Sequence, residues 1–405
     1  MPLPRFPVAF GVALGVLGLV SEVRAEQRTH NYLTTGNGHG FQVFDTQTNR
    51  ITTFLEHPYR YVRPQPGAPP PTVPQGDGVG RRDLAFDMLF GVKGGGGQGW
   101  LTDPGGESPE YLDQTNIIRV PTPAFGVSTE AFYFAPFGLE KNVMIALLHA
   151  PGATAGFTSL NFHMGSGTPD PDASNESVHP ATGMTDAFVE TGAGSGAMVY
   201  VALSTLAHAD CQGEYGKVQG GGALGDTSTC AGNDLALGLQ GTPVGDGWMG
   251  VAIGFSEDAG GADALATAIK TWANGRTPDK ILADARAEWD AWRKPPPAGT
   301  ALCSDDEKKL WRQSEAVLRM GQVREPNVPG RKNHGMVLAS LPPGEWHSGW
   351  VRDAMYAVVA LARLGHHEES KAALDFFLNA EPVGKYKSYV KNQDYRISVV
   401  RYFGT

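Results

Sequence analysis

Short runs in which hydrophobic and polar residues alternate fill residues 30–258, and glycine- and proline-rich turns separate them. Alternation with a period of two is typical of strands that bury one face. The clearest predicted strands are 41–45 and 51–55, which form a hairpin, and 116–120, 129–134, 143–148, 197–203 and 248–255. So many short strands at this spacing predict a large antiparallel β-sandwich, to which we assign residues 26–258.

The hydrophobic period changes to that of helices after residue 258. Residues 261–274 and 277–292 have helical spacing and end at Lys294-Pro295-Pro296-Pro297, so we expect a helical linker over residues 259–298. Ser304 and Glu307 have the spacing of a capping box. Helices are then predicted at 350–364 and 366–379, antiparallel because only Gly365 separates them.

The predicted helix at 350–364 is apolar almost all round, so we expect neighbours to bury it on nearly every side. Buried helices that alternate with amphipathic ones are explained by concentric rings, an α/α toroid. Residues 299–405 would supply its opening helices.

The first 25 residues have the pattern of a secretory signal peptide. Arg5 precedes an apolar run over residues 8–20, and Val23-Arg24-Ala25 resembles a cleavage site. We expect a secreted or periplasmic protein with no stable membrane span after leader removal; an uncleaved anchor is the alternative. In that setting Cys211 and Cys230 are candidates for a disulfide, which leaves Cys303 unpaired.

Charge and composition argue against some classes of binding partner and cofactor. The net charge is -9 and no basic patch carries interleaved aromatics, which argues against nucleic acid. No Cys/His spacing resembles a zinc site, and we expect no cofactor. The oxygen-rich residues 170–175 are either a calcium loop or a solvated turn.

A polar cluster stands at the start of the helix predicted at 350–364. It contains Trp346, Trp350, Arg352 and Asp353. Asp353 suits the positive end of the helix dipole, whereas Arg352 does not. Either the two form an ion pair that closes the loop onto the helix, or they bind substrate hydroxyls while a tryptophan offers an aromatic platform.

Several motifs resemble glycoside hydrolase family 15, the prokaryotic glucoamylases and glucodextranases. They are Thr35-Gly36-Asn37-Gly38-His39-Gly40-Phe41, Glu56-His57-Pro58-Tyr59-Arg60, Tyr111-Leu112-Asp113-Gln114-Thr115-Asn116, Gly335-Met336-Val337-Leu338-Ala339-Ser340 and Trp350-Val351-Arg352-Asp353-Ala354. The resemblance implies a super-β-sandwich, a helical linker and an (α/α)6 barrel. It also implies inverting release of glucose from the non-reducing ends of α-glucans. Arg352 and Asp353 would then bind the terminal sugar, with Trp350 lining the pocket.

Inverting hydrolysis needs two carboxyl groups, one acid and one base. The resemblance places both glutamates on later barrel loops, beyond Thr405, so neither is assigned; Glu345 and Glu381 match neither position. We therefore expect this chain to bind an α-glucan oligo- or polysaccharide but to lack hydrolase activity by itself. The alternatives are a carbohydrate-binding protein that uses Trp100 and Trp248, and a sugar phosphorylase or trehalase-like enzyme of the same plan.

Overall fold

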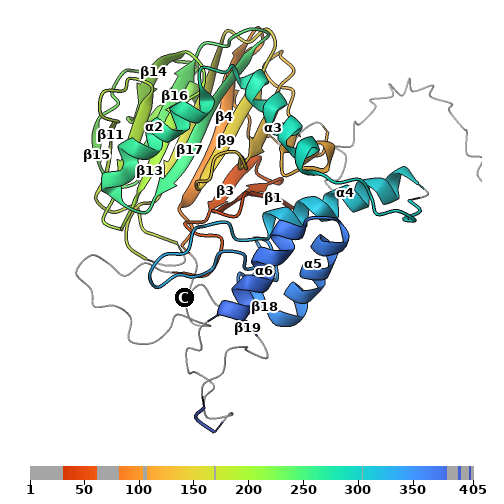
Figure 1. Cartoon of the computed structure of the whole chain (residues 1–405). Coiled ribbons are helices and arrows are strands. Elements are labelled where there is room, and N and C mark those ends of the chain that lie inside the picture. The colour runs from red at the N-terminus through yellow and green to blue at the C-terminus, as the bar shows by residue number, and fades with distance from the viewer. Residues whose placement is uncertain are drawn as a thin grey trace, which may run out of the picture.

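The structure is a computed structural model that describes residues 31–61, 82–103, 107–167, 170–302, 304–380, 391–393 and 401–402. The predicted leader, Cys303 and Glu381 lie outside these ranges. The described part of the chain contains a β-sandwich, two helices against one of its sheets, and a group of three further helices (Figure 1).

Two antiparallel sheets form the sandwich. The first has the order β1-β2-β3-β4-β10-β16-β14, with β5 paired to β4; its strands are Tyr32–Gly36, Phe41–Asp45, Arg50–Phe54, Ala85–Gly94, Ala155–Phe162, Ala236–Gly241 and Leu206–Asp210, with β5 at Gly97–Trp100. The second has the order β15-β11-β12-β13-β17-β9-β8-β7-β6; its strands are Cys230–Gly232, Glu176–Pro180, Ala187–Thr191, Ala197–Ala202, Trp248–Ser256, Val143–His149, Glu130–Phe134, Ile118–Pro121 and Glu110–Tyr111. The antiparallel sheets confirm the predicted sandwich.

The space between the sheets holds one large apolar core. Alternate side chains of both sheets meet there, among them Phe44, Ile51, Phe90, Leu160 and Tyr200. This is the packing that an alternating pattern predicts, because every second residue of a strand points to the same face. The hairpin of β2 and β3 lies where the sequence places it.

Helices α2 (Ala262–Ala273) and α3 (Pro278–Trp292) cover the outer face of the second sheet (Figure 1). Leu265 and Ile269 of α2 and Ile281 of α3 pack there against β9, β13 and β17. Strand β9 is therefore buried on both faces, which explains why its sequence is a continuous apolar run without alternation.

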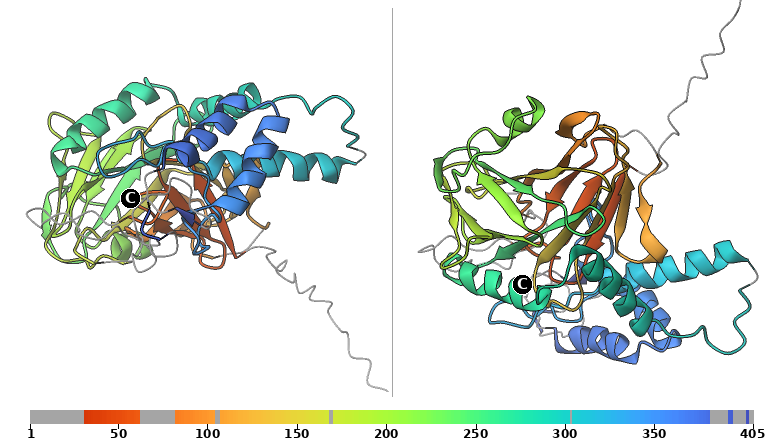
Figure 2. Two further views of the ribbon diagram at one scale, coloured as in Figure 1. Left: turned by 60° about the horizontal axis from the view of Figure 1, so that its bottom comes forward. Right: turned by 90° about the horizontal axis from the view of Figure 1, so that it is seen from above.

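The remaining helices are α1 (Glu214–Gln219), the 3-10 turns η1 (Leu112–Gln114) and η2 (Ala259–Gly261), α4 (Asp305–Met320), α5 (Val351–Arg363) and α6 (His367–Asn379). The capping box of α4 is confirmed: Ser304 Oγ accepts from the Glu307 amide at 3.1 Å, and the Glu307 carboxylate accepts from the Ser304 amide at 2.9 Å. Gly365 has a φ of 85° between α5 and α6, which lie side by side (Figure 2). The short strand β18 (Gly349–Trp350) directly precedes α5 and pairs with the short strand β19 (Arg401–Tyr402), which follows α6 in the chain.

Helix α5 is buried on one face only, so the prediction that neighbours cover it nearly all round is wrong for the described residues. Ala354, Ala357, Val358 and Leu361 are buried, whereas Tyr356 is 76% exposed. The neighbouring helices α4 and α6 cover one face, and no other described helix packs on the opposite one. The described residues of α4–α6 thus present apolar side chains to solvent.

Cys211, directly after β14, is joined by a disulfide to Cys230, the first residue of β15. The bond links an edge strand of each sheet at one end of the sandwich. No helix of the described residues is both long and apolar enough to cross a lipid bilayer.

Candidate functional site

The loop at 339–348 presents the first tryptophan of the predicted cluster to solvent. Trp346 is 52% exposed, and its ring lies 4.8 Å from that of Trp350. The loop is closed by its own bonds: the Ala339 amide donates to the Ser348 carbonyl at 3.0 Å, and the Trp346 amide donates to Ser340 Oγ at 2.9 Å. The ring pair is therefore held on an ordered loop.

A sandwich residue also holds this loop. Arg60 donates from its guanidinium to the Glu345 carbonyl at 2.5 Å, and its amide donates to the His347 carbonyl at 3.3 Å. The Glu345 carboxylate lies 3.3 Å from the same guanidinium and is mostly exposed. Glu345 thus contributes to a contact between the sandwich and the loop.

Arg352 and Asp353 stand in the first turn of α5, which begins after the extended residue Trp350. Their closest charged atoms are 4.0 Å apart, and the Arg352 side chain is 79% exposed. An ion pair so open to water contributes little to stability. The structure therefore gives the loop-closing interpretation little support, and it leaves both side chains accessible to a ligand.

Three hollows lie around the helical part. A groove of about 360 Å³ between α4 and α5 is lined mainly by apolar side chains, and also by Ser340, Asp353 and Tyr356. A second hollow of about 590 Å³ lies beside α6 and is lined by His334, His367 and Lys371 among others. Trp346 and Arg352 line neither of these two hollows, so of the predicted cluster only Asp353 reaches one.

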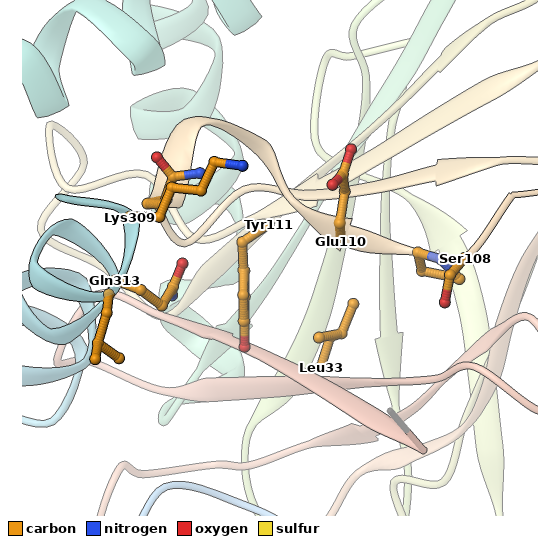
Figure 3. A pocket seen from close by; sticks show the side chains of 9 residues that line it. Leu33, Ser108, Glu110, Tyr111, Lys309 and Gln313 are labelled. Carbon is orange, nitrogen blue, oxygen red and sulfur yellow. The ribbon is translucent and has the colours of Figure 1, made fainter. Parts of the chain in front are cut away.

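The third hollow, of about 410 Å³, lies between α4 and the edge strand β6 (Figure 3). Tyr111 stands in it, but its hydroxyl donates to the Thr34 carbonyl and accepts from the Thr34 amide, both at 2.8 Å. Burial raises the pKa of Tyr111 to about 12, so the hydroxyl stays protonated near neutral pH. The Tyr111 hydroxyl is thus already engaged in hydrogen bonds within the protein.

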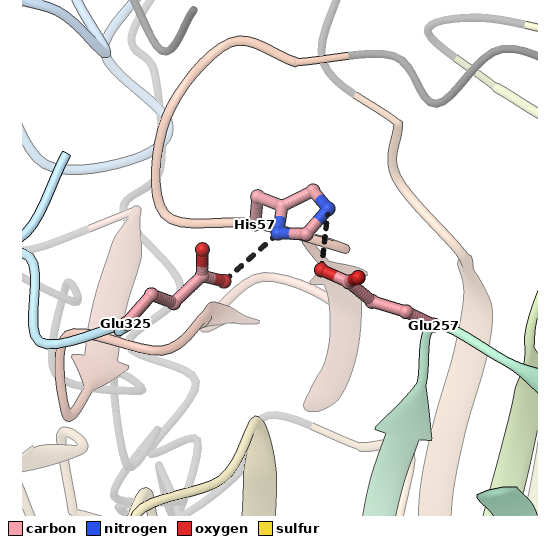
Figure 4. A group of neighbouring side chains, drawn as sticks. All are labelled: His57, Glu257 and Glu325. Carbon is pink, nitrogen blue, oxygen red and sulfur yellow. Dashed lines mark hydrogen bonds and ion pairs between the residues drawn. The ribbon is translucent and has the colours of Figure 1, made fainter. Parts of the chain in front are cut away.

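A charged cluster around the buried His57 joins the sandwich to the segment after α4. His57 follows β3, Glu257 follows β17, and Glu325 and Arg331 belong to residues 323–336. Nδ1 of His57 lies 2.8 Å from a Glu325 oxygen and its Nε2 lies 3.3 Å from a Glu257 oxygen (Figure 4). We call His57, Glu257, Glu325 and Arg331 the joint cluster.

Arg331 supplies the cation of the joint cluster. Its guanidinium contacts both oxygens of Glu257, at 2.5 and 2.7 Å, and one nitrogen lies 3.0 and 3.1 Å from the two ring nitrogens of His57. The same guanidinium lies 4.8 Å from the ring centre of Tyr61, and the hydroxyl of Tyr59 donates to Glu325.

His57, Glu257 and Glu325 offer ligand atoms within 4.8 Å of one another, as a metal site would. The Arg331 guanidinium, however, already lies against all three of these side chains. We therefore interpret the group as an ion-paired joint and assign none of its residues as a metal ligand.

The titration of the joint cluster follows from its contacts. Burial disfavours a charge on His57, but Glu325 and Glu56 outweigh burial and raise its pKa above the ordinary value. His39, also buried, behaves in the opposite way: burial lowers its pKa to about 4, despite opposing contributions from Glu325 and Glu140.

Sequence reasoning found His57 only as part of a family motif, and it missed Glu257, Glu325 and Arg331. These residues lie in segments that only the fold brings together, so no spacing could have signalled them. The two tryptophans of the binding-module alternative differ in their surroundings: Trp100 is buried beside Phe157 and Tyr215, while the partly buried Trp248 stacks with Phe132 and with His149. Trp100 thus has no free face for a sugar.

No protein-family model matches the sequence, and no curated protein sequence matches it. Among solved structures, the fold matches a bacterial glucoamylase complexed with acarbose, with a TM-score of 0.56 and 12% sequence identity. The match covers 84% of this chain and 48% of the glucoamylase chain, so this chain spans about half the length of that enzyme.

Two weaker likenesses are to enzymes of Bacteroides thetaiotaomicron, and no conclusion rests on them. A family GH92 inverting mannosidase has a TM-score of 0.39 and 10% identity over 72% of this chain and 37% of its own. A family GH92 α-mannosidase has a TM-score of 0.39 and 14% identity, over 76% of this chain and 42% of its own. The fold of this chain thus resembles that of a bacterial glucoamylase, as the sequence motifs predict.

Proposed function

We propose that this chain provides the sandwich and the sugar-binding helices of a glucoamylase-like glycoside hydrolase. Its substrates would be α-glucans, from whose non-reducing ends glucose is released with inversion. The observation that carries the proposal is the exposed group of Trp346, Arg352 and Asp353 at the start of α5, within a fold that matches an acarbose-bound glucoamylase.

These side chains suit sugar recognition chemically. A guanidinium and a carboxylate form directional bonds with adjacent hydroxyls, and an indole ring packs on the apolar face of a pyranose. The general acid and base stay unassigned.

The exposed apolar residues of α4–α6 support a further part of the proposal. Leu310, Val317, Tyr356 and Val359 are exposed, and the groove between α4 and α5 is apolar. Apolar surface of this extent is typical of a face that packs on other helices. We propose that α4, α5 and α6 are the opening helices of an (α/α)6 barrel. The disulfide supports a secreted or periplasmic location, since such bonds persist in oxidising compartments.

Calorimetric titration of the chain with acarbose and with maltotetraose tests the proposal. We expect binding of both, and a loss of at least about tenfold in Arg352→Ala, equal to about 1.4 kcal/mol. Arg363→Ala is the matched control, because it removes the same charge from the last turn of the same helix. Failure of the wild-type chain to bind either sugar, or equal affinity in both variants, would overturn the proposal.

Glucose release from maltotetraose is measured on the same samples. Binding without release agrees with a sugar-binding group that lacks its acid and base. Release that is lost in Arg352→Ala would mean that two carboxylates of this chain perform the reaction.

A further inference from the structure

The joint cluster connects two parts of the chain that are far apart in sequence. His57, Tyr59 and Glu257 belong to the sandwich side, whereas Glu325 and Arg331 belong to residues 323–336, after α4. The Arg324 amide, in the same segment, donates to the Gly38 carbonyl of the sandwich at 2.8 Å. The segment is thus docked on the sandwich by charged side chains and by a backbone bond.

The protonation state of His57 decides whether its contacts attract or repel. Both ring nitrogens face carboxylate oxygens: Nδ1 faces Glu325 at 2.8 Å, and Nε2 faces Glu257 at 3.3 Å and Glu56 at 3.9 Å. An imidazolium has a proton on each nitrogen and donates to both sides. A neutral imidazole would turn one lone pair toward a carboxylate, which is unfavourable in a buried site. The Arg331 nitrogen, 3.0 and 3.1 Å from the two ring nitrogens, opposes the charged form, but the contributions of Glu325 and Glu56 are larger and favour it.

The charges around His57 also favour its protonated form. Among the described residues, the groups that face His57 are Glu56, Tyr59 and Tyr61 on its own segment, Glu257 after β17, and Glu325 and Arg331 on residues 323–336. Arg82 pairs with Glu56 at 3.5 Å. Two guanidiniums therefore face three carboxylates, and a protonated His57 completes the balance.

We propose that His57 is an imidazolium that joins the β-sandwich to residues 323–336, and that loss of its proton at alkaline pH releases this joint. A histidine that is charged in the fold binds its proton more tightly there than in the unfolded chain. Its stabilising contribution is complete below its unfolded pKa of about 6.5 and is lost as pH rises through the higher folded pKa. The joint is therefore closed below about pH 6.5 and opens as the pH rises through the folded pKa of His57.

The first measurement is the nitrogen spectrum of the chain labelled with ¹⁵N-histidine. At pH 7.5 an ordinary histidine is about 10% protonated, whereas we expect His57 to be mostly protonated, with both nitrogens giving imidazolium shifts. His57→Gln identifies the signal by its loss. His39→Gln is the matched control, because His39 is buried near the same Glu325 but has a pKa of about 4 and is neutral at this pH.

The second measurement is hydrogen exchange of the Arg324 amide, corrected for the intrinsic effect of pH. In wild type and in His39→Gln we expect its protection to fall at least about tenfold as His57 titrates, and in His57→Gln to be low throughout. The wild-type titration tests the proposal without any variant, so the proposal remains testable even if His57→Gln folds poorly. A neutral His57 at pH 7.5, or a titration that leaves the Arg324 amide equally protected, would overturn it.

Discussion

Arg60→Ala should loosen the loop that carries Trp346 without unfolding the chain. The guanidinium of Arg60 donates to the Glu345 carbonyl at 2.5 Å, across the boundary between the sandwich and the loop at 339–348. The sandwich holds this loop near the exposed tryptophan through Arg60, and it also holds the loop through Thr34, whose hydroxyl donates to the Pro342 carbonyl. Its backbone bond to His347, at 3.3 Å, would survive the substitution.

The size of the effect follows from the type of bond. A hydrogen bond with one charged partner contributes about 1.5–3 kcal/mol when buried, and this one is near a partly exposed surface, so we take about 1.5 kcal/mol. That amount changes the ratio of docked to undocked loop by about tenfold. Since the loop keeps its internal bonds, we expect the amides of Ser340 and Trp346 to lose about tenfold in protection, and acarbose affinity to fall by no more than that factor.

Hydrogen exchange of the loop and calorimetry with acarbose provide the assay, and Glu345→Gln is the control. This control removes the carboxylate, which is mostly exposed and adds little, but it keeps the backbone carbonyl that Arg60 binds. Unchanged protection in Arg60→Ala would refute the reasoning. An equally large effect of Glu345→Gln would show that the ion pair, and not the backbone bond, holds the loop.

Two further predictions concern stability and are measured by urea unfolding. Arg319 is buried against the rings of Phe137, Trp289 and Trp292 at 3.8–4.7 Å, and burial lowers its pKa to about 9. Arg319→Met nearly keeps the volume of the side chain and removes the buried charge, so we expect it to change the unfolding free energy by no more than about 1 kcal/mol. Arg319→Ala leaves a cavity and should lower the unfolding free energy by about 3 kcal/mol. Equal losses in the two variants would contradict this prediction. Replacing both Cys211 and Cys230 by serine should lower stability by about 3 kcal/mol, because their sequence separation of 19 sets the entropy of the closed loop; a loss below about 1 kcal/mol would contradict this.

The parts of the fold that local patterns determine were predictable from the sequence. The β2–β3 hairpin, the capping box of α4 and the α5–α6 pair depend on residues close together in the chain, and the structure has all three. Strand β10 gave no such signal, because Ala155–Phe162 mixes glycine and hydroxyl side chains into a central strand. Its burial between β4 and β16 is a property of the sheet and not of its own sequence.

The extent of burial of α5 was not predictable for a related reason. Its apolar composition states which side chains favour burial, but the elements that cover them are set by tertiary packing. Val358 packs in the core shared with α4 and α6, whereas Tyr356 and Val359 on the same helix are exposed among the described residues. A helix pattern thus identifies an apolar surface without identifying what covers it.

The residues of the candidate site likewise fall into a group that the sequence predicts and a group that only the fold brings together. Arg352 and Asp353 were found because they are adjacent in one motif, while the joint cluster draws on residues 57, 257, 325 and 331. The fold relates the two groups through a single sandwich segment: His57 and Tyr59 contact the 323–336 segment, and Arg60 contacts the Trp346 loop. Opening the joint at alkaline pH should therefore also weaken sugar binding, although no residue of the joint cluster belongs to the proposed sugar-binding group. If Arg60→Ala removes that pH dependence of affinity while His57 still titrates, the coupling passes through Arg60; if the dependence persists, it passes through residues 337–340 instead.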